Sequence, residues 1–154
     1  MNEMKLSFDL IKYFVYNNFM CIFCKIVQNE LPSVKVYEDE RVLGFMDINP
    51  LNDGHVLVIP KRHAETIFEI DPDELRAVVD VAQKIALAIK KALNPDGLVV
   101  IQLNQKAAGQ VVPHLHIHLI PRWENDGLPI ARWEPMPGDM DKIKNIAERI
   151  KKEL

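Results

Sequence analysis

The chain has 154 residues, of which 48% are hydrophobic and 27% charged, as in one ordinary globular domain rather than a disordered chain. Its 19 lysine and arginine residues are balanced by 22 acidic ones, and the net charge of −3 argues against general nucleic-acid binding, which needs a basic surface. No stretch reaches the roughly 18 uninterrupted apolar residues of a transmembrane helix, so the sequence predicts no membrane span.

The first residues of the chain are apolar enough to raise the question of a signal peptide. Asp9 and Lys12 interrupt the apolar stretch, and no small-residue cleavage site follows. We therefore expect residues 1–20 to be a retained N-terminal extension and the protein to be cytoplasmic. Apolar residues at helical spacing over 6–16 predict a short helix that packs on the domain or a partner, with membrane-surface binding as the alternative.

Residues 21–154 are predicted to form one domain with five strands. Short β-branched or alternating runs predict these strands, and turn residues separate the first three as in an antiparallel meander. The predicted strands are Val34–Tyr37, Val42–Asp47, His55–Ile59, Leu98–Leu103 and His114–Ile120.

A long helix is expected between the third and fourth strands. Asp71 can cap its start, and Pro72 suits its first position. Asn94-Pro95 should end it. A further helix is expected from about Asp139 to the end of the chain, and together these elements indicate an α+β fold with a mainly antiparallel sheet. The predicted apolar face of the long helix consists of Leu75, Val78, Val79, Ala82, Ile85, Ala86, Ile89 and Leu93.

Three histidines alternate with apolar residues in the fifth predicted strand, at His114, His116 and His118. Alternate side chains of a strand point to opposite faces, so the three imidazoles are expected on one face. A single histidine on a strand is commonly a hydrogen-bonded core residue. Three in register instead indicate a functional cluster, because imidazole serves as acid, base, nucleophile and metal ligand.

The chain has two cysteines, Cys21 and Cys24, which form a C-x-x-C motif. Two cysteines are too few for a disulfide framework. Together with the histidines beside the predicted sheet, they suggest a zinc site with two cysteine and two histidine ligands. A redox dithiol is the competing interpretation, although the expected thioredoxin-like strand and helix are missing. Two unpaired thiols remain the third possibility.

The polar segment from Asn104 to Gln110 joins the fourth and fifth predicted strands. Its backbone N–H groups and amide side chains could wrap an anion, and an ordinary hairpin loop is the alternative. Its arrival at the three histidines favours a phosphate site.

Four segments in continuous order closely resemble the histidine triad (HIT) family: residues 21–26, 45–50, 54–63, and Gly109-Gln110 leading into 114–122. The last segment contains the family's H-x-H-x-H signature, and the resemblance covers roughly residues 21 to 125. It implies a HIT-like fold and a homodimer built through the long helix, here Asp73 to Leu93.

HIT proteins bind purine nucleotides, such as AMP conjugates, and cleave a bond at the α-phosphorus through a nucleotidyl-histidine intermediate. The resemblance implies that His116 is the nucleophile and that His118 and His55 contact the phosphate. It implies that Asp47 accepts both ribose hydroxyls. The remaining nucleotide-binding residues expected are Ile22, Phe23, Ile26, Phe45 and Ile48 around the base, with Asn104, Gly109 and Gln110 in the loop.

The resemblance is to the zinc-containing, Hint-like branch of the family. In that branch the zinc ligands correspond to Cys21, Cys24, His63 and His114. This set leaves His116 and His118 for the chemistry, so the zinc would be structural.

The function implied is that of a phosphoramidase-like nucleotide hydrolase or transferase. Diadenosine polyphosphate hydrolysis and a zinc-stabilised nucleotide-binding module with little turnover are the alternatives. The chain departs from the family at Val111, where a serine or threonine hydroxyl usually contacts the phosphate or leaving group, and Pro113 precedes the first histidine. This departure leaves the leaving-group preference open.

Overall fold

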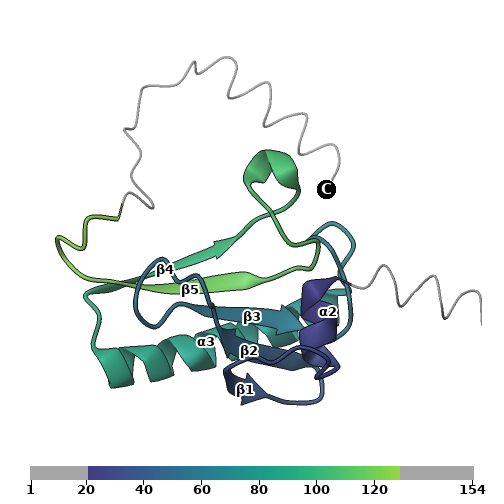
Figure 1. Ribbon diagram of the computed structural model, residues 1–154, viewed down its shortest axis with the longest axis horizontal. Coiled ribbons are helices and arrows are strands. Elements are labelled where there is room, and N and C mark those ends of the chain that lie inside the picture. Colours follow the sequence, from purple (N-terminus) through teal and green to yellow (C-terminus); the bar gives the residue numbers. More distant parts are fainter. Residues whose placement is uncertain (1–20, 129–154) are drawn as a thin grey trace, which may run out of the picture.

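The computed structural model describes residues 21–128, whose central feature is a five-stranded antiparallel sheet in the order β1-β2-β3-β5-β4 (Figure 1). The sheet confirms the predicted α+β class. The helices expected over 6–16 and from Asp139 lie outside the described residues. None of the helices within 21–128 is long and apolar enough to cross a membrane. The strands are β1 (Lys35–Glu38), β2 (Val42–Met46), β3 (Val56–Pro60), β4 (Gly97–Gln102) and β5 (Ile117–Arg122).

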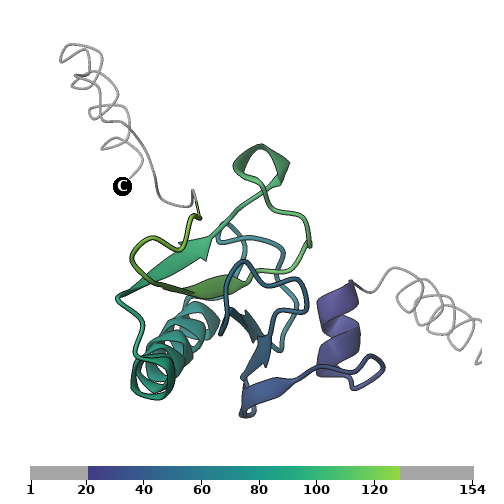
Figure 2. The same cartoon turned by 60° about the vertical axis from the view of Figure 1, so that its left-hand side comes forward.

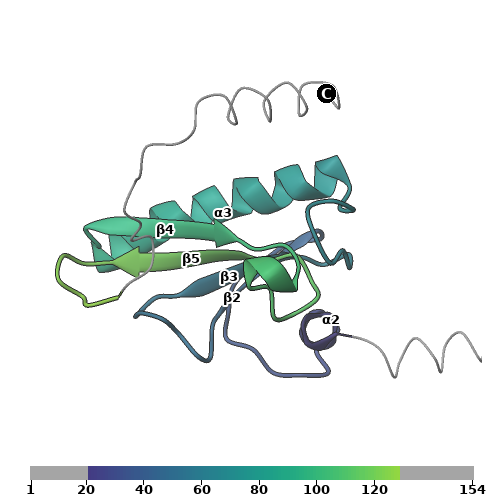
Figure 3. The same ribbon diagram turned by 90° about the horizontal axis from the view of Figure 1, so that it is seen from above.

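Helices cover both faces of the sheet (Figure 2, Figure 3), with α3 (Pro72–Leu93) on one face and α2 (Ile22–Val27) on the other. Because strand side chains alternate, β2 and β3 each contribute to both layers. The layer under α3 includes Val42, Val56, Val58, Leu115, Ile117 and Leu119. The layer under α2 consists of Phe23, Ile26, Leu43, Phe45, Leu57 and Ile59.

Helix α3 begins and ends as predicted. The Asp71 carboxylate accepts hydrogen bonds from the backbone N–H groups of Asp73 (2.8 Å) and Glu74 (3.4 Å), and Pro72 is the first helical residue. Asn94 ends the helix in the left-handed conformation, at φ 46°. The local sequence is therefore sufficient to define both ends of this helix.

The apolar face of α3 is narrower than predicted. Val79 and Leu93 are exposed, whereas Val81, which was not expected on this face, is buried. Successive residues of a helix are separated by about 100° around its axis. The sheet covers the stripe that contains Val78, Ala82 and the residues one turn away from them. Val79 lies beyond the edge of this stripe.

Strand β5 starts at Ile117, three residues later than predicted. β4 ends at Gln102, opposite Ile117, and β3 ends at Pro60, which has no N–H to donate to a neighbouring strand. The segment before β5 is held instead by a hydrogen bond from the Leu115 N–H to the Ala64 carbonyl (2.7 Å). The bounds of the other four strands differ from the predicted ones by no more than one residue.

Helix α2 (Ile22–Val27) is not among the elements predicted from the sequence. Its six residues are too few for a clear helical period. Cys21 caps it, because the Cys24 N–H donates to the Cys21 Sγ at 3.3 Å. This helix turns Cys21 and Cys24 toward the same side, three residues apart.

Candidate functional site

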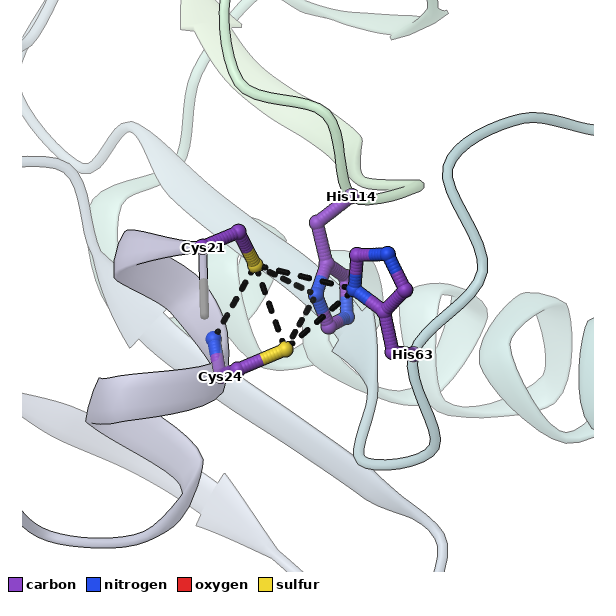
Figure 4. Close-up of side chains that lie close together, drawn as sticks. All are labelled: Cys21, Cys24, His63 and His114. Carbon is purple, nitrogen blue, oxygen red and sulfur yellow. Dashed lines mark hydrogen bonds between the residues drawn. The ribbon is translucent and has the colours of Figure 1, made fainter. Parts of the chain in front are cut away.

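Four potential metal ligands meet between the start of α2 and the segment before β5 (Figure 4). Cys21 and Cys24 come from α2 and its cap, His63 from the loop after β3, and His114 from the segment before β5. The two sulfur atoms are 3.2 Å apart, and the sulfur-to-Nδ1 distances run from 3.2 to 3.7 Å. The fold thus brings together residues that are up to 93 positions apart.

The spacing of these four donor atoms fits a tetrahedral metal site. Bonds of about 2.3 Å to sulfur and 2.1 Å to nitrogen separate the ligand atoms of tetrahedral zinc by roughly 3.3 to 3.8 Å. The observed sulfur–sulfur and sulfur–nitrogen distances of 3.2 to 3.7 Å are close to that range. Two thiols and two imidazoles also form a donor set that suits zinc.

The hydrogen bonding of His114 prepares it as a ligand. Its Nε2 donates to the Pro60 carbonyl at 2.8 Å, so Nδ1 carries the lone pair that faces the two sulfurs. Burial lowers the pKa of His114 to about 4, which keeps the imidazole neutral at pH 7. Burial raises the pKa of the Cys24 thiol to about 12, so a bound cation has to displace its proton.

A cavity of about 630 Å³ opens beside this cluster, between α2, the end of β2 and the segment before β5. Its wall is mainly apolar. Of the residues expected from the sequence to bind nucleotide or react, it contains Ile22, Phe23, Ile26, Phe45, Asp47, Ile48, Gly109, His116 and His118. Phe23 packs edge-on against both Phe45 (ring centroids 5.5 Å apart) and His116 (5.3 Å), so an aromatic ring joins the apolar wall to the histidines.

His116 is held as a neutral imidazole with one free ring nitrogen. Its Nδ1–H donates to the His114 carbonyl at 2.6 Å, which assigns the lone pair to Nε2. The side chain is 5% exposed, and burial lowers its pKa. A neutral imidazole whose orientation is set by one nitrogen can act as a nucleophile through the other.

His55 and His118 form a second hydrogen-bonded pair, outside the metal cluster. The Leu51 N–H donates to His55 Nδ1 at 3.1 Å, so His55 carries its proton on Nε2, which lies 2.9 Å from His118 Nδ1. His118 then carries its proton on Nε2. Burial lowers the pKa of both, that of His118 to about 4, with the charges of neighbouring histidines as a smaller cause. Both rings are therefore neutral hydrogen-bond donors at pH 7.

Asp47 lies at the end of β2 and lines the cavity. Its Oδ1 accepts a hydrogen bond from the Asn49 N–H at 2.8 Å, and its Oδ2 is 3.7 Å from His55 Nε2. Asp47, His55 and His118 also form a group whose donor atoms lie within 4.8 Å of one another. The His55–His118 hydrogen bond already occupies two of those nitrogens.

Three residues expected to contact the nucleotide, His55, Asn104 and Gln110, do not line the cavity. Asn104 Oδ1 accepts from the Ile67 N–H at 2.7 Å, and Gln110 Nε2 donates to the Glu65 carbonyl at 2.6 Å. Both amides therefore hold the loop over 104–110 against the loop after β3. Gly109, at φ 91°, is the residue of this loop that reaches the cavity.

The sequence analysis missed several residues of the cavity wall. No local pattern marks them, because they come from loops and from strand ends that only the packing of α2 brings together. The missed residues are Leu31, Pro32, Ser33, Met46, Asn49, Leu57, Leu103 and Val112.

Comparisons with known proteins agree with this geometry. The model of the HIT domain family matches residues 28–125. The adenosine 5′-monophosphoramidase of Candida albicans is 39% identical, over 87% of this chain and 91% of that protein. A crystal structure of a HIT family member from Bacillus subtilis has a TM-score of 0.81 at 42% identity, over 87% of this chain and 96% of the other.

A second crystal structure, of a Zn-bound histidine triad family protein from Mycobacterium smegmatis, has a TM-score of 0.68 at 39% identity. The similarity covers 75% of this chain and 84% of that one. The family match includes most of the described residues, and with them His55, His63 and the three histidines of the H-x-H-x-H segment. On these grounds the chain belongs to the HIT domain family.

Proposed function

We propose that the protein is a phosphoramidase-like nucleotide hydrolase or transferase, which cleaves a bond at the α-phosphorus of purine nucleotide conjugates. The observation that carries this proposal is His116, a neutral imidazole in the cavity with Nδ1 tied to a carbonyl and Nε2 free. The name of the Candida albicans relative, an adenosine 5′-monophosphoramidase, supports the same class of reaction.

In the proposed reaction, His116 Nε2 attacks the phosphorus of an AMP amidate. A phosphorus–nitrogen bond to the imidazole forms while the bond to the amine breaks, and the amine leaves after taking up a proton from water. A second water then attacks the phosphorus, releases AMP and restores the imidazole. His118 donates a hydrogen bond from Nε2–H that stabilises negative charge on a non-bridging oxygen, which supplies a large share of catalysis in such sites. His55, whose Nε2–H is bonded to His118 Nδ1, orients that donor.

The nucleoside would occupy the apolar end of the cavity. Asp47 is proposed to accept hydrogen bonds from both ribose hydroxyls. A purine ring would pack among the side chains of α2 and β2, where Phe23 and Phe45 offer aromatic edges. Burying the base in this way would hold the phosphorus beside His116.

Zinc is proposed as the metal of the four-ligand cluster, held by Cys21, Cys24, His63 and His114. Bound there, it would tie α2 to the segment before β5 and supply structural stability. Its support is the tetrahedral spacing of the donors and the Zn-bound relative. Reduced cysteines that bind zinc also suit the cytoplasm, the compartment we infer for the protein.

We also propose a homodimer, with the exposed side of α3 and strand β4 as its interface. Val79 and Leu87 are exposed on α3, and Val100 is exposed on β4, which is an edge strand of the sheet. Exposed apolar side chains on a helix, beside a strand at the edge of the sheet formed by residues 21–128, offer a surface that a second copy could cover.

The proposed function predicts AMP release from a nucleotide amidate. Purified protein incubated with an AMP amidate and, separately, with diadenosine tetraphosphate should release AMP faster from the amidate, as measured by chromatography. Faster cleavage of the tetraphosphate would favour the polyphosphate hydrolase. Tight AMP binding with no turnover of either compound would favour a binding module.

Val111→Ser should speed hydrolysis of alkyl amidates more than of aryl amidates. Val111 lines the cavity and is 90% exposed, so a serine hydroxyl there could donate to the departing nitrogen without disturbing packing. An alkylamine needs a proton to leave, whereas an arylamine needs little help. One such hydrogen bond is worth roughly ten- to several hundred-fold in rate. Initial rates on matched alkyl and aryl substrates measure the difference.

Val36→Ser serves as the matched control for this substitution, because Val36 is also exposed but lies on β1 outside the cavity. Its rates on both substrates should equal those of the wild type. If Val111→Ser left both rates unchanged or slowed them, another group would already be delivering the proton, and the interpretation of Val111 would be wrong.

A further inference from the structure

The base end of the cavity contains one polar side chain with an unsatisfied hydrogen-bonding group. Ser33 lines the cavity together with Leu31 and Pro32. Among the buried side-chain oxygen and nitrogen atoms of residues 21–128, Ser33 Oγ is the one for which the structure provides no hydrogen-bond partner. Buried hydroxyls are nearly always paired, so an unpaired one in a cavity wall indicates a partner that arrives with a ligand.

The position of Ser33 relative to Asp47 narrows the choice of ligand atom. The Met46 N–H donates to the Val34 carbonyl at 2.9 Å, which extends the β1–β2 pairing to the residue before the start of β1. Ser33 precedes Val34 and Asp47 follows Met46, so the two lie side by side on neighbouring, antiparallel segments. Both residues line the cavity. A group bound by Asp47 is therefore next to Ser33, and rotation about the Ser33 Cα–Cβ bond turns the buried hydroxyl toward it.

We propose that Ser33 recognises the purine base by donating a hydrogen bond from its hydroxyl to ring nitrogen N3. This inference rests on the proposed function, in which Asp47 binds the ribose hydroxyls. In a nucleotide with its base in the anti orientation, N3 lies on the base edge nearest the 2′-hydroxyl. It is an acceptor in every purine, and the hydroxyl is a donor. Ser33 thus selects a purine with an unprotonated N3, without distinguishing adenine from guanine at that atom.

The test compares the affinities of Ser33→Ala and the wild type for AMP and three analogues. The analogues are 1-deaza-, 3-deaza- and 7-deaza-AMP, each of which replaces one ring nitrogen by CH, and calorimetry gives the dissociation constants. Ser33→Ala should bind AMP about three- to tenfold more weakly, as for loss of one neutral hydrogen bond. It should lose the same factor for 1-deaza- and 7-deaza-AMP. For 3-deaza-AMP the two proteins should have equal affinity.

Thermal stability separates ligand recognition from a role in the fold. Because the Ser33 hydroxyl has no partner in the protein, Ser33→Ala without nucleotide should melt at the wild-type temperature or slightly above it. Val34→Ala is the matched control, since Val34 is the next residue but lies outside the cavity and is 63% exposed. It should leave the affinity for all four nucleotides unchanged.

Three outcomes would overturn the proposal. If Ser33→Ala bound AMP as tightly as the wild type, the hydroxyl would have no part in recognition. If it lost affinity for 3-deaza-AMP as much as for AMP, the hydroxyl would contact a different atom. If it melted at a lower temperature with unchanged affinity, the hydroxyl would be structural. A wild type that bound no AMP would instead overturn the proposed function itself, together with this inference.

Discussion

His116→Asn should abolish turnover while AMP affinity stays within a few-fold of the wild type. The asparagine amide can still donate to the His114 carbonyl, which now accepts from His116 Nδ1 at 2.6 Å, so the cavity should keep its shape. What disappears is the nitrogen that attacks phosphorus. Removing a nucleophile of this kind costs on the order of 10⁴-fold or more in kcat. Steady-state assays with an AMP amidate, paired with calorimetry of AMP binding, measure both quantities.

His118→Asn provides the comparison for this prediction. Its imidazole is proposed to act through one hydrogen bond to the phosphate, and loss of one such donor costs roughly 10²- to 10³-fold. Mass spectrometry of the rapidly quenched wild type should detect an adenylyl group on His116. An adduct mapped to His118, or a larger rate loss in His118→Asn than in His116→Asn, would reverse the two roles.

Cys24→Ser should lose the bound metal and much of its thermal stability. The Cys24 sulfur lies 3.2 Å from His63 Nδ1 and 3.5 Å from His114 Nδ1, so it is central to the four-ligand cluster. Structural zinc contributes on the order of 10 kcal/mol in small zinc domains, and even a fraction of that would lower the melting temperature by about 10 °C or more. Metal analysis should find about one zinc per wild-type chain, and calorimetry gives the melting temperatures.

Ile22→Ser is the matched control, because Ile22 lies in the same helix as Cys24 but is half exposed and outside the metal cluster. It should keep full zinc content. A strong chelator should destabilise the wild type and this control while leaving Cys24→Ser unaffected. A Cys24→Ser protein that retained one zinc per chain and its melting temperature would remove Cys24 from the ligand set.

The elements that depend on local chemistry could be read from the sequence. Asp71 and Pro72 start α3 and Asn94 ends it, because capping and backbone restriction act within a few residues. The alternation of His114, His116 and His118 with apolar residues also survives in the structure, although β5 starts only at Ile117. A period of two assigns side chains to faces in any extended segment, whether or not it is paired in a sheet.

Features that depend on distant partners needed the tertiary structure. Six residues of α2 have little helical preference by themselves, and the helix is packed through Phe23 and Ile26 onto the sheet. Asn104 and Gln110 were expected to bind nucleotide because of their amides, but those amides bond to a loop some 40 residues away. An amide pairs with whichever backbone the fold brings near, and residue type alone does not reveal this.

The sequence by itself therefore determined which residue types the protein has for its chemistry: two thiols, five imidazoles and one carboxylate in a recognisable order. The tertiary structure decided the protonation and the hydrogen bonding of these side chains. The carbonyls of Pro60 and His114 assign the ring nitrogens of His114 and His116, and the folded chain leaves the Ser33 hydroxyl buried without a partner. Protonation and hydrogen bonding depend on neighbours that are close in space and remote in the chain.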